Sequence, residues 1–257
     1  MFAAGGLRTV TARWLAHPYD VAVTALMGLD VKLRLARTLV IVDTHHDDIP
    51  TFVSRLFDAG ADMVQFRDLD ASLGEVATAV VEAQQVAMQR NKLVAVTGDL
   101  VLAKAVMADV LVGGPSLDPG LAHARMHEYA LVGTPVFDPV SCYSVSTDHK
   151  IDFALVGPVH LPPGSTVAAP GLDLVRAAAG AMPAGDASGT PWFAVGGLTT
   201  TNVGEAIAAG ARRVGLVVTG QGDLGAVTAV ATALQQAWGS DPDLKDFAFR
   251  VLSGGGW

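Results

Sequence analysis

FAVGGLT occupies residues 193–199 and RVGLVVTG occupies residues 213–220. Each segment combines glycine with an apolar run as long as a buried strand. Between them, residues 202–209 place apolar side chains at the three- and four-residue spacing of a helix. A strand, a helix and a second strand in this order form a βαβ unit, whose two strands are parallel. This stretch therefore predicts an α/β fold.

The same alternation extends back to residue 39 and continues to residue 238. The predicted strands are residues 39–43, 62–66, 93–96, 110–112, 130–136, 152–156, 192–195 and 213–218, and the clearest helices are 73–90, 100–107, 202–209 and 224–238. The strand runs are apolar throughout, as expected for parallel strands that are buried on both faces. Eight such units in 257 residues predict a (β/α)8 TIM barrel, which takes roughly 250 residues.

A similar short motif recurs at the predicted helix ends that precede several strands. Residues 58–62 read DAGAD, residues 107–109 read MAD and residues 208–211 read AAGA. Glycine adopts the left-handed conformation that closes a helix without the steric cost of a side chain. Gly60 and Gly210 are therefore predicted to end helices.

Three parts of the chain are expected. Residues 38–240 form the barrel. Residues 1–37 form an N-terminal extension, expected to be helical, that covers the bottom of the barrel or mediates self-association into a homo-oligomer. It carries five basic and two acidic side chains, a net +3 against −11 for the remainder. Residues 241–257 are expected to be a C-terminal tail, in which residues 241–243 and 253–256 form surface and a frayed end.

Composition excludes some partners. A net charge of −8 would repel nucleic acid and anionic membranes. No apolar run reaches the length of about 18 residues that spans a bilayer. The single cysteine, Cys142, cannot form an internal disulfide, which is typical of a reducing compartment. A cytoplasmic protein that binds neither nucleic acid nor membrane is expected.

The glycine pair that follows strand seven favours an anion site. Gly196 and Gly197 let backbone amides approach an anion without interference from Cβ, and the helix that follows adds its partial positive charge. In barrels of this class the loops after strands seven and eight commonly hold phosphate. A phosphorylated small molecule is therefore the expected partner. The alternative is that both glycines only permit a tight turn.

Four motifs, taken in order, resemble the thiamine-phosphate synthase and thiazole tautomerase superfamily over residues 39–238. They are MVQFR at 63–67, VGPV at 156–159, AVGGL at 194–198 with Asn202, and VVT at 217–219. The resemblance implies an enzyme that joins a hydroxymethylpyrimidine diphosphate to a thiazole phosphate with Mg²⁺. It implies substrate contacts from Gln65, Arg67 and Thr134, and phosphate contacts from Gly196, Gly197, Val218 and Thr219.

This chain departs from the family pattern where metal and diphosphate are handled. Leu69 replaces a lysine, Thr97 and Gly98 replace an Asn-Asp pair, and Ser116 replaces a second aspartate. Mg²⁺ prefers carboxylate and other hard oxygen ligands. It is therefore expected only if Asp99 and Asp118, each within two positions of a lost carboxylate, take over, which is not the favoured interpretation. Residues 162–165 read PPGS in place of Thr-x-Thr-Lys.

Three functions remain open, and the enzyme status with them. The first is a divergent member of this superfamily that binds a phosphorylated heterocycle of the thiazole phosphate or thiamine phosphate type, with a role in thiamine biosynthesis. The second is a non-catalytic phosphate-binding or regulatory barrel. The third is a metal-dependent hydrolase that uses DTHHDD at residues 43–48.

The hydrolase hypothesis meets two objections. Adjacent histidines such as His45 and His46 point to opposite sides of a strand. Asp48, followed by Pro50, also fits the start of a helix. His160, after strand six, is expected to be solvated.

Overall fold

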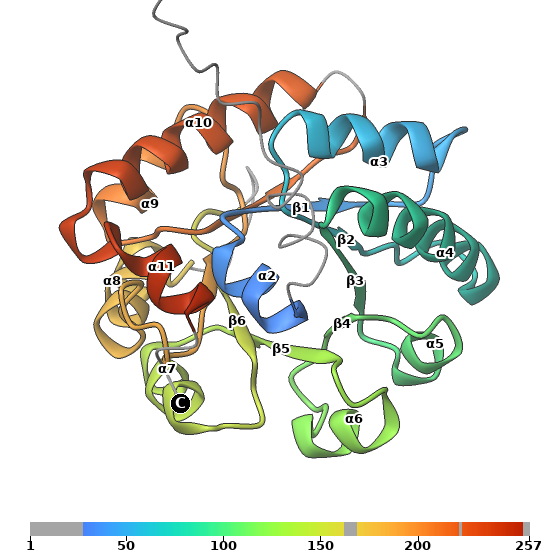
Figure 1. The fold of residues 1–257 in the computed structure, drawn as a ribbon, viewed down its shortest axis with the longest axis horizontal. Coiled ribbons are helices and arrows are strands. Elements are labelled where there is room, and N and C mark those ends of the chain that lie inside the picture. Colours follow the sequence, from blue (N-terminus) through green and yellow to red (C-terminus); the bar gives the residue numbers. More distant parts are fainter. Residues whose placement is uncertain (1–27, 162–168, 221–222, 254–257) are drawn as a thin grey trace, which may run out of the picture.

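The computed structural model describes residues 28–161, 169–220 and 223–253. Eight parallel strands close into a barrel in which each strand pairs with the next and β8 pairs with β1 (Figure 1). The strands are β1 (Thr38–Val42), β2 (Met63–Phe66), β3 (Leu93–Thr97), β4 (Val110–Val112), β5 (Leu131–Val136), β6 (Phe153–Val156), β7 (Trp192–Ala194) and β8 (Val214–Val217). The predicted (β/α)8 barrel is confirmed.

The helices that follow the strands surround the barrel (Figure 1). They are α3 (Ile49–Asp58), α4 (Leu73–Arg90), α5 (Leu100–Ala105), α6 (Pro119–Arg125), α7 (Pro139–Thr147), α8 (Gly171–Ala181), α9 (Val203–Ala208) and α10 (Leu224–Ser240). Helix α2 (Leu29–Leu35) precedes β1, and a 3₁₀ turn, η2 (Pro242–Leu244), and α11 (Phe247–Leu252) follow α10. Side chains near the helix ends help to set where the helices begin and end. Ser72 and Glu75 form a capping box at the start of α4, which satisfies amides that the helix leaves unbonded.

The predicted helix ends are also confirmed. Gly60 and Gly210 have φ of 107° and 111° and directly follow the caps of α3 and α9. The third motif lacks glycine, and there Met107 itself takes a φ of 51°. A side chain in this region of φ is uncommon and carries a steric cost, so the position is locally strained.

Side chains fill the barrel interior. Leu39, Met63, Leu93, Val110, Leu131 and Phe153 lie at or near the amino ends of their strands in one buried cluster. The rings of Phe153 and Phe193 meet edge to face at 6.3 Å. Phe153 requires glycine opposite, since a Cβ on Gly133 would lie 2.2 Å from its ring. The lower barrel is therefore a packed core, and a ligand inside the barrel is expected near the carboxyl ends of the strands.

Helix α2 covers the amino ends of the strands. Leu33 is fully buried in the interior cluster, and α2 crosses the centre of the barrel in the view of Figure 1. The described end of the expected N-terminal extension thus lies over the bottom of the barrel. The rest of that expected extension, residues 1–27, lies outside the described residues.

The expected C-terminal tail contains regular structure at residues 242–252. Helix α11 and turn η2 bury Leu244, Phe247 and Val251 in a cluster that also contains Trp238 and Val31. The three buried residues are spaced by three and four positions. The sequence of this short segment therefore has the spacing of apolar residues that is typical of a helix.

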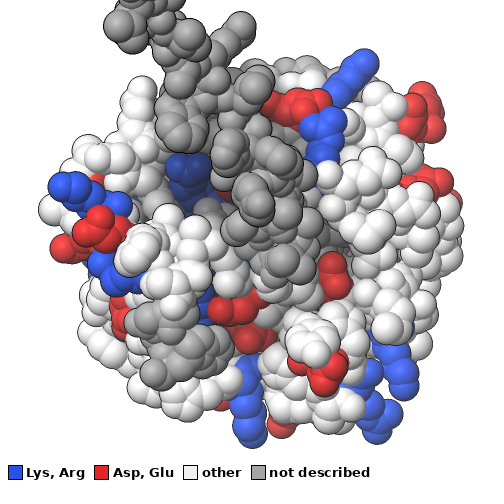
Figure 2. Space-filling view, viewed as in Figure 1, with Lys and Arg blue, Asp and Glu red and all other residues white. Residues whose placement is uncertain are grey.

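The face that carries α2 mixes charges of both signs. Figure 2 shows Lys and Arg side chains scattered among Asp and Glu around its rim. Mixed signs weaken the field that either charge would produce alone. None of the described helices has the length and apolar character needed to cross a membrane.

Candidate functional site

A cavity of about 430 Å³ opens at the carboxyl ends of the strands. All eight strands contribute, each through a residue at or just beyond its end. Gln65, Arg67 and Gly196, three of the predicted site residues, line it together. Phe137 and Val217 add exposed apolar surface. A cavity of this size and mostly apolar lining suits a small ring compound that is oriented by a few polar groups.

Gln65 is the most constrained polar group in this cavity. Its side chain is 2% exposed, and its Nε2 donates to Thr97 Oγ1 at 2.9 Å. Thr97 Oγ1 donates in turn to the Phe66 carbonyl at 2.8 Å. These bonds fix the amide so that Oε1 is the free acceptor, and Oε1 is buried without a hydrogen-bond partner. An unpaired buried acceptor is costly, so a ligand donor would stabilise it.

Arg67 brings the positive charge. It follows β2, is exposed, and is the one charged residue among the described residues that line the cavity. Its backbone amide donates to the Val42 carbonyl at 2.9 Å, which ties the start of this loop to β1. A guanidinium held at the mouth of a mostly apolar cavity is suited to pair with a phosphate.

Gly196 and Gly197 have φ of 90° and 64°. Within the described part of the chain, no hydrogen bond from either amide N–H is found. Both glycines also permit close packing, because a Cβ on Gly196 would lie 2.7 Å from Pro158 and one on Gly197 would lie 2.5 Å from the His160 carbonyl oxygen. The two glycines therefore do permit a tight turn, as the alternative interpretation holds. Their amides are also available to donate hydrogen bonds to a ligand.

His160 is half-buried and not fully solvated. Its backbone amide donates to the Gly196 carbonyl at 3.0 Å. Its Nε2 is buried without a hydrogen-bond partner. The histidine thus belongs to the packing beneath the glycine turn, and its ring is absent from the cavity lining.

The amides at the end of β8 are already paired. The Val218 amide already donates to the Ile41 carbonyl at 2.9 Å, and its side chain is 1% exposed in the layer between sheet and helices. The Val218 amide is therefore already paired within the barrel, and the expected phosphate contact of this residue stays a prediction. The Thr219 amide donates to the Asp223 carboxylate at 3.1 Å.

Thr134 does not join the other predicted residues. Its neighbour Pro135 lines the cavity, and successive residues of a strand face opposite sides. Val132 and Val136, two positions to either side, are buried in the outer layer. Thr134 therefore faces the helices and not the cavity, and its expected substrate contact stays a prediction.

The residues at the mouth do not fit Mg²⁺. Among the described lining residues there is no carboxylate. Asp99 accepts hydrogen bonds from the amides of Val101 and Leu102, and Asp118 accepts one from the amide of Leu121. Both carboxylates thus cap helices α5 and α6. The described residues at the cavity therefore offer no carboxylate ligands that would hold Mg²⁺.

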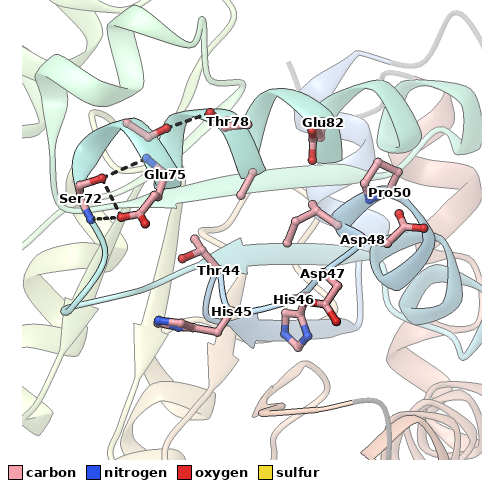
Figure 3. Close-up of a pocket in the computed structure, with 13 residues that line it drawn as sticks. Thr44, His45, His46, Asp47, Asp48, Pro50, Ser72, Glu75, Thr78 and Glu82 are labelled. Atoms are coloured by element: carbon pink, nitrogen blue, oxygen red, sulfur yellow. Dashed lines mark hydrogen bonds between the residues drawn. The ribbon is translucent and has the colours of Figure 1, made fainter.

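Residues 44–48, from the DTHHDD segment that follows β1, line a separate hollow between α3 and α4 (Figure 3). Figure 3 shows His45 and His46 pointing in different directions. The side chain of His45 is 68% exposed, whereas that of His46 is 9% exposed and stacks on Phe52. Within the described ranges no group of three potential ligands is close enough to hold a metal. Asp48 caps α3 by accepting from the Thr51 amide at 3.0 Å, as the helix-cap interpretation predicts.

Asp68 joins two of the loops at this end of the barrel, a role that the sequence did not indicate. Its side chain is 3% exposed. It accepts from the Thr44 hydroxyl at 2.7 Å and the Thr44 amide at 3.0 Å, and from the amides of Asp70 and Ala71. The bonds from Thr44 hold the pKa of the Asp68 carboxyl well below its ordinary value of 3.8. Asp68 therefore supports the loop that carries Arg67.

Replacing Asp68 by asparagine is expected to lower the free energy of unfolding at pH 7 by about 2 kcal/mol, a typical loss for hydrogen bonds to a charged group. Because folding depresses this pKa, the stabilisation is present above pH 3.8 and is lost as the pH falls further. Urea unfolding of the wild type and the variant from pH 7 to pH 3 measures the difference. Asp70→Asn, at an exposed neighbour, should change little. A difference that persists unchanged at pH 3 would contradict this account.

Fold and cavity together define a (β/α)8 barrel of the class that holds a small ligand where its strands end. A family model described as thiamine monophosphate synthase matches residues 38–219. The chain therefore belongs to the thiamine monophosphate synthase family.

Relatives and a solved structure agree with this assignment. The chain is 32% identical over 204 residues to a thiamine-phosphate synthase of Saccharopolyspora erythraea, covering 75% of this chain and 89% of that protein. It is 33% identical over 206 residues to one of Mycobacterium leprae, covering 74% and 85%. A solved thiamine phosphate pyrophosphorylase from Pyrococcus furiosus has the same fold, with a TM-score of 0.63 at 20% identity over 88% of this chain and all of that one.

Proposed function

We propose that this barrel binds a phosphorylated heterocycle of the thiazole phosphate or thiamine phosphate type in the cavity where its strands end. The observation that carries the proposal is the combination in one cavity of the unpaired Gln65 Oε1, the Arg67 guanidinium and the Gly196 turn. The names of the relatives, thiamine-phosphate synthases, support this class of ligand.

Each group has one task in this proposal. Gln65 Oε1 accepts a hydrogen bond from a donor on the ring, which removes the cost of the unpaired oxygen. The apolar lining, including Phe137 and Val217, excludes water around the ring. Arg67 and the amides of Gly196 and Gly197 bind the phosphate. Binding and orientation need no metal in this arrangement.

The first candidate function is binding of the phosphorylated heterocycle without catalysis. The second is metal-assisted synthesis of thiamine phosphate. The second candidate rests on family membership. The first is favoured by the lack of carboxylates among the lining residues that the structure describes and by Leu69, which is 84% exposed where the family pattern has a lysine. Assaying the purified protein with both thiamine precursors and Mg²⁺ separates the two, since formation of thiamine phosphate would establish the second.

Thiamine phosphate is expected to raise the melting temperature equally with Mg²⁺ and with a chelator. At a ligand concentration of about 100 times Kd, the expected gain is about 2.7 kcal/mol, or roughly 5–10 °C for a domain of this size. Arg67→Ala should remove most of that gain, because it deletes the one cation among the described lining residues.

Two controls accompany the measurement. Arg125→Ala removes an exposed arginine at the end of α6, away from the cavity lining, and should leave the gain intact. Thiamine without phosphate should stabilise the protein much less. The proposal fails if no phosphorylated heterocycle stabilises the protein, or if stabilisation appears only with Mg²⁺.

A further inference from the structure

The hydroxyl of Thr97 lies in the middle of a short chain of hydrogen bonds in the cavity wall. Thr97 is the last residue of β3 and lines the cavity together with Gln65. Its Oγ1 donates to the Phe66 carbonyl at 2.8 Å and accepts from Gln65 Nε2 at 2.9 Å. The hydroxyl therefore joins the end of β3 to two residues of β2.

The direction of these two bonds follows from which groups carry hydrogen. A carbonyl oxygen can only accept, so the Phe66 carbonyl takes the single hydrogen of the Thr97 hydroxyl. The hydroxyl can then only accept from Gln65, which requires the amide to turn its nitrogen toward Thr97. The oxygen of Gln65 is left over, buried and without a hydrogen-bond partner.

The backbone around Thr97 holds its side chain in place. Thr97 pairs with Val112 of β4, and the amide of the next residue, Gly98, donates to the Val112 carbonyl at 2.8 Å. On the other side, Val96 pairs with Phe66 of β2. The side chain of threonine is branched at Cβ, which restricts its rotation further. The Thr97 hydroxyl is thus a fixed point to which the amide of Gln65 is tied.

We propose that Thr97 is a positioning residue that holds the Gln65 amide with its oxygen left for the ligand, so that the cavity selects ring compounds with an N–H donor. This role rests on the proposed function, in which Gln65 contacts the ring. A ligand with a donor pairs the buried oxygen, whereas a ligand without one leaves it unpaired at a cost. Sites built around one hydrogen bond reject analogues that cannot make it for the same reason.

Two ligands that differ by one donor measure this selectivity. Thiamine phosphate carries an amino group on its pyrimidine ring, and its deamino analogue has hydrogen in that position. The wild type is expected to bind thiamine phosphate about 30-fold more tightly than the analogue, which is within the range for one unpaired buried acceptor. Calorimetry on the full chain gives both dissociation constants and hence their ratio.

Thr97→Val removes the hydroxyl and keeps the shape of the side chain. The Gln65 amide then loses the bond that fixes it and can turn its nitrogen toward the ligand, so the ratio should fall to about threefold or less. Thr97→Ser restores a hydroxyl and should restore the ratio. Thr97→Ala also lacks the hydroxyl and should give the same low ratio, which keeps the test possible if the valine variant does not fold.

Thr232→Val is the matched control. The Thr232 hydroxyl also donates to a backbone carbonyl, that of Thr228 at 2.8 Å. Thr232 is exposed on α10 and is absent from the cavity lining. Its replacement should leave both dissociation constants, and therefore their ratio, unchanged.

The ratio separates positioning from a merely structural role. If Thr97→Val weakens both ligands by the same factor, or changes neither, Thr97 does not orient Gln65 and its proposed role is refuted, while the proposed function stands. A wild type that binds thiamine phosphate no more tightly than the analogue also refutes the role of Thr97 alone. If the wild type binds neither ligand, the proposed function fails as well.

Discussion

Gly196→Ala is expected to destabilise the protein by about 2–4 kcal/mol, within the range for a substitution that strains a special backbone conformation. Two causes combine. Gly196 has a φ of 90°, which side chains rarely adopt, and its new Cβ would lie 2.7 Å from both Cα and Cβ of Pro158. Since the backbone at Pro158 cannot yield easily, the loops after β6 and β7 must separate.

Thermal unfolding measures this loss as a fall in melting temperature of roughly 5–15 °C. Gly204→Ala is the control, because Gly204 lies inside α9 with open space around its Cβ position. Alanine there should be neutral or slightly stabilising, as alanine favours helix over glycine. Equal melting temperatures for Gly196→Ala and Gly204→Ala would mean that the close approach to Pro158 is not required.

The second large effect is expected at Arg213, which is 2% exposed. Its guanidinium donates to the carbonyls of Ala36 at 3.1 Å and Arg34 at 2.8 Å, and stacks over Trp238 and Phe247. Burial, with a smaller contribution from Arg34, holds the pKa of Arg213 below its ordinary value. No ion pair to Arg213 is found among the described residues. The side chain thus joins α2, β8 and the C-terminal helices.

Arg213→Ala is expected to lower the free energy of unfolding by about 3 kcal/mol, because it leaves two carbonyls unpaired and opens a cavity. Arg213→Met should lose less, since it keeps apolar volume against Trp238. Chemical denaturation measures both. Arg176→Ala, whose exposed partner is Asp173, should change stability by less than about 0.5 kcal/mol. If Arg213→Ala is as stable as Arg176→Ala, the Arg213 side chain does not stabilise the packing of α2 and β8 against the C-terminal helices.

Local features were predictable from the sequence because neighbouring residues determine them. The strand positions follow from short apolar runs, and the helix starts follow from residues such as Ser72 and Asp48, whose side chains bond amides three positions along. Gly60 and Gly210 end helices because glycine alone adopts their conformation cheaply. The order of these elements predicts a closed barrel, and hence that Gln65, Arg67 and Gly196 meet at one end.

Tertiary structure decided what those residues do there. Both faces of β5 are buried, so hydrophobicity could not reveal that Pro135 faces inward and Thr134 outward. The bond between Gln65 and Thr97 joins residues 32 positions apart, and the Val218 amide is committed only because β8 pairs with β1. Barrel closure sets these partners, since a side chain's direction and a backbone group's availability depend on strands that are distant in the chain.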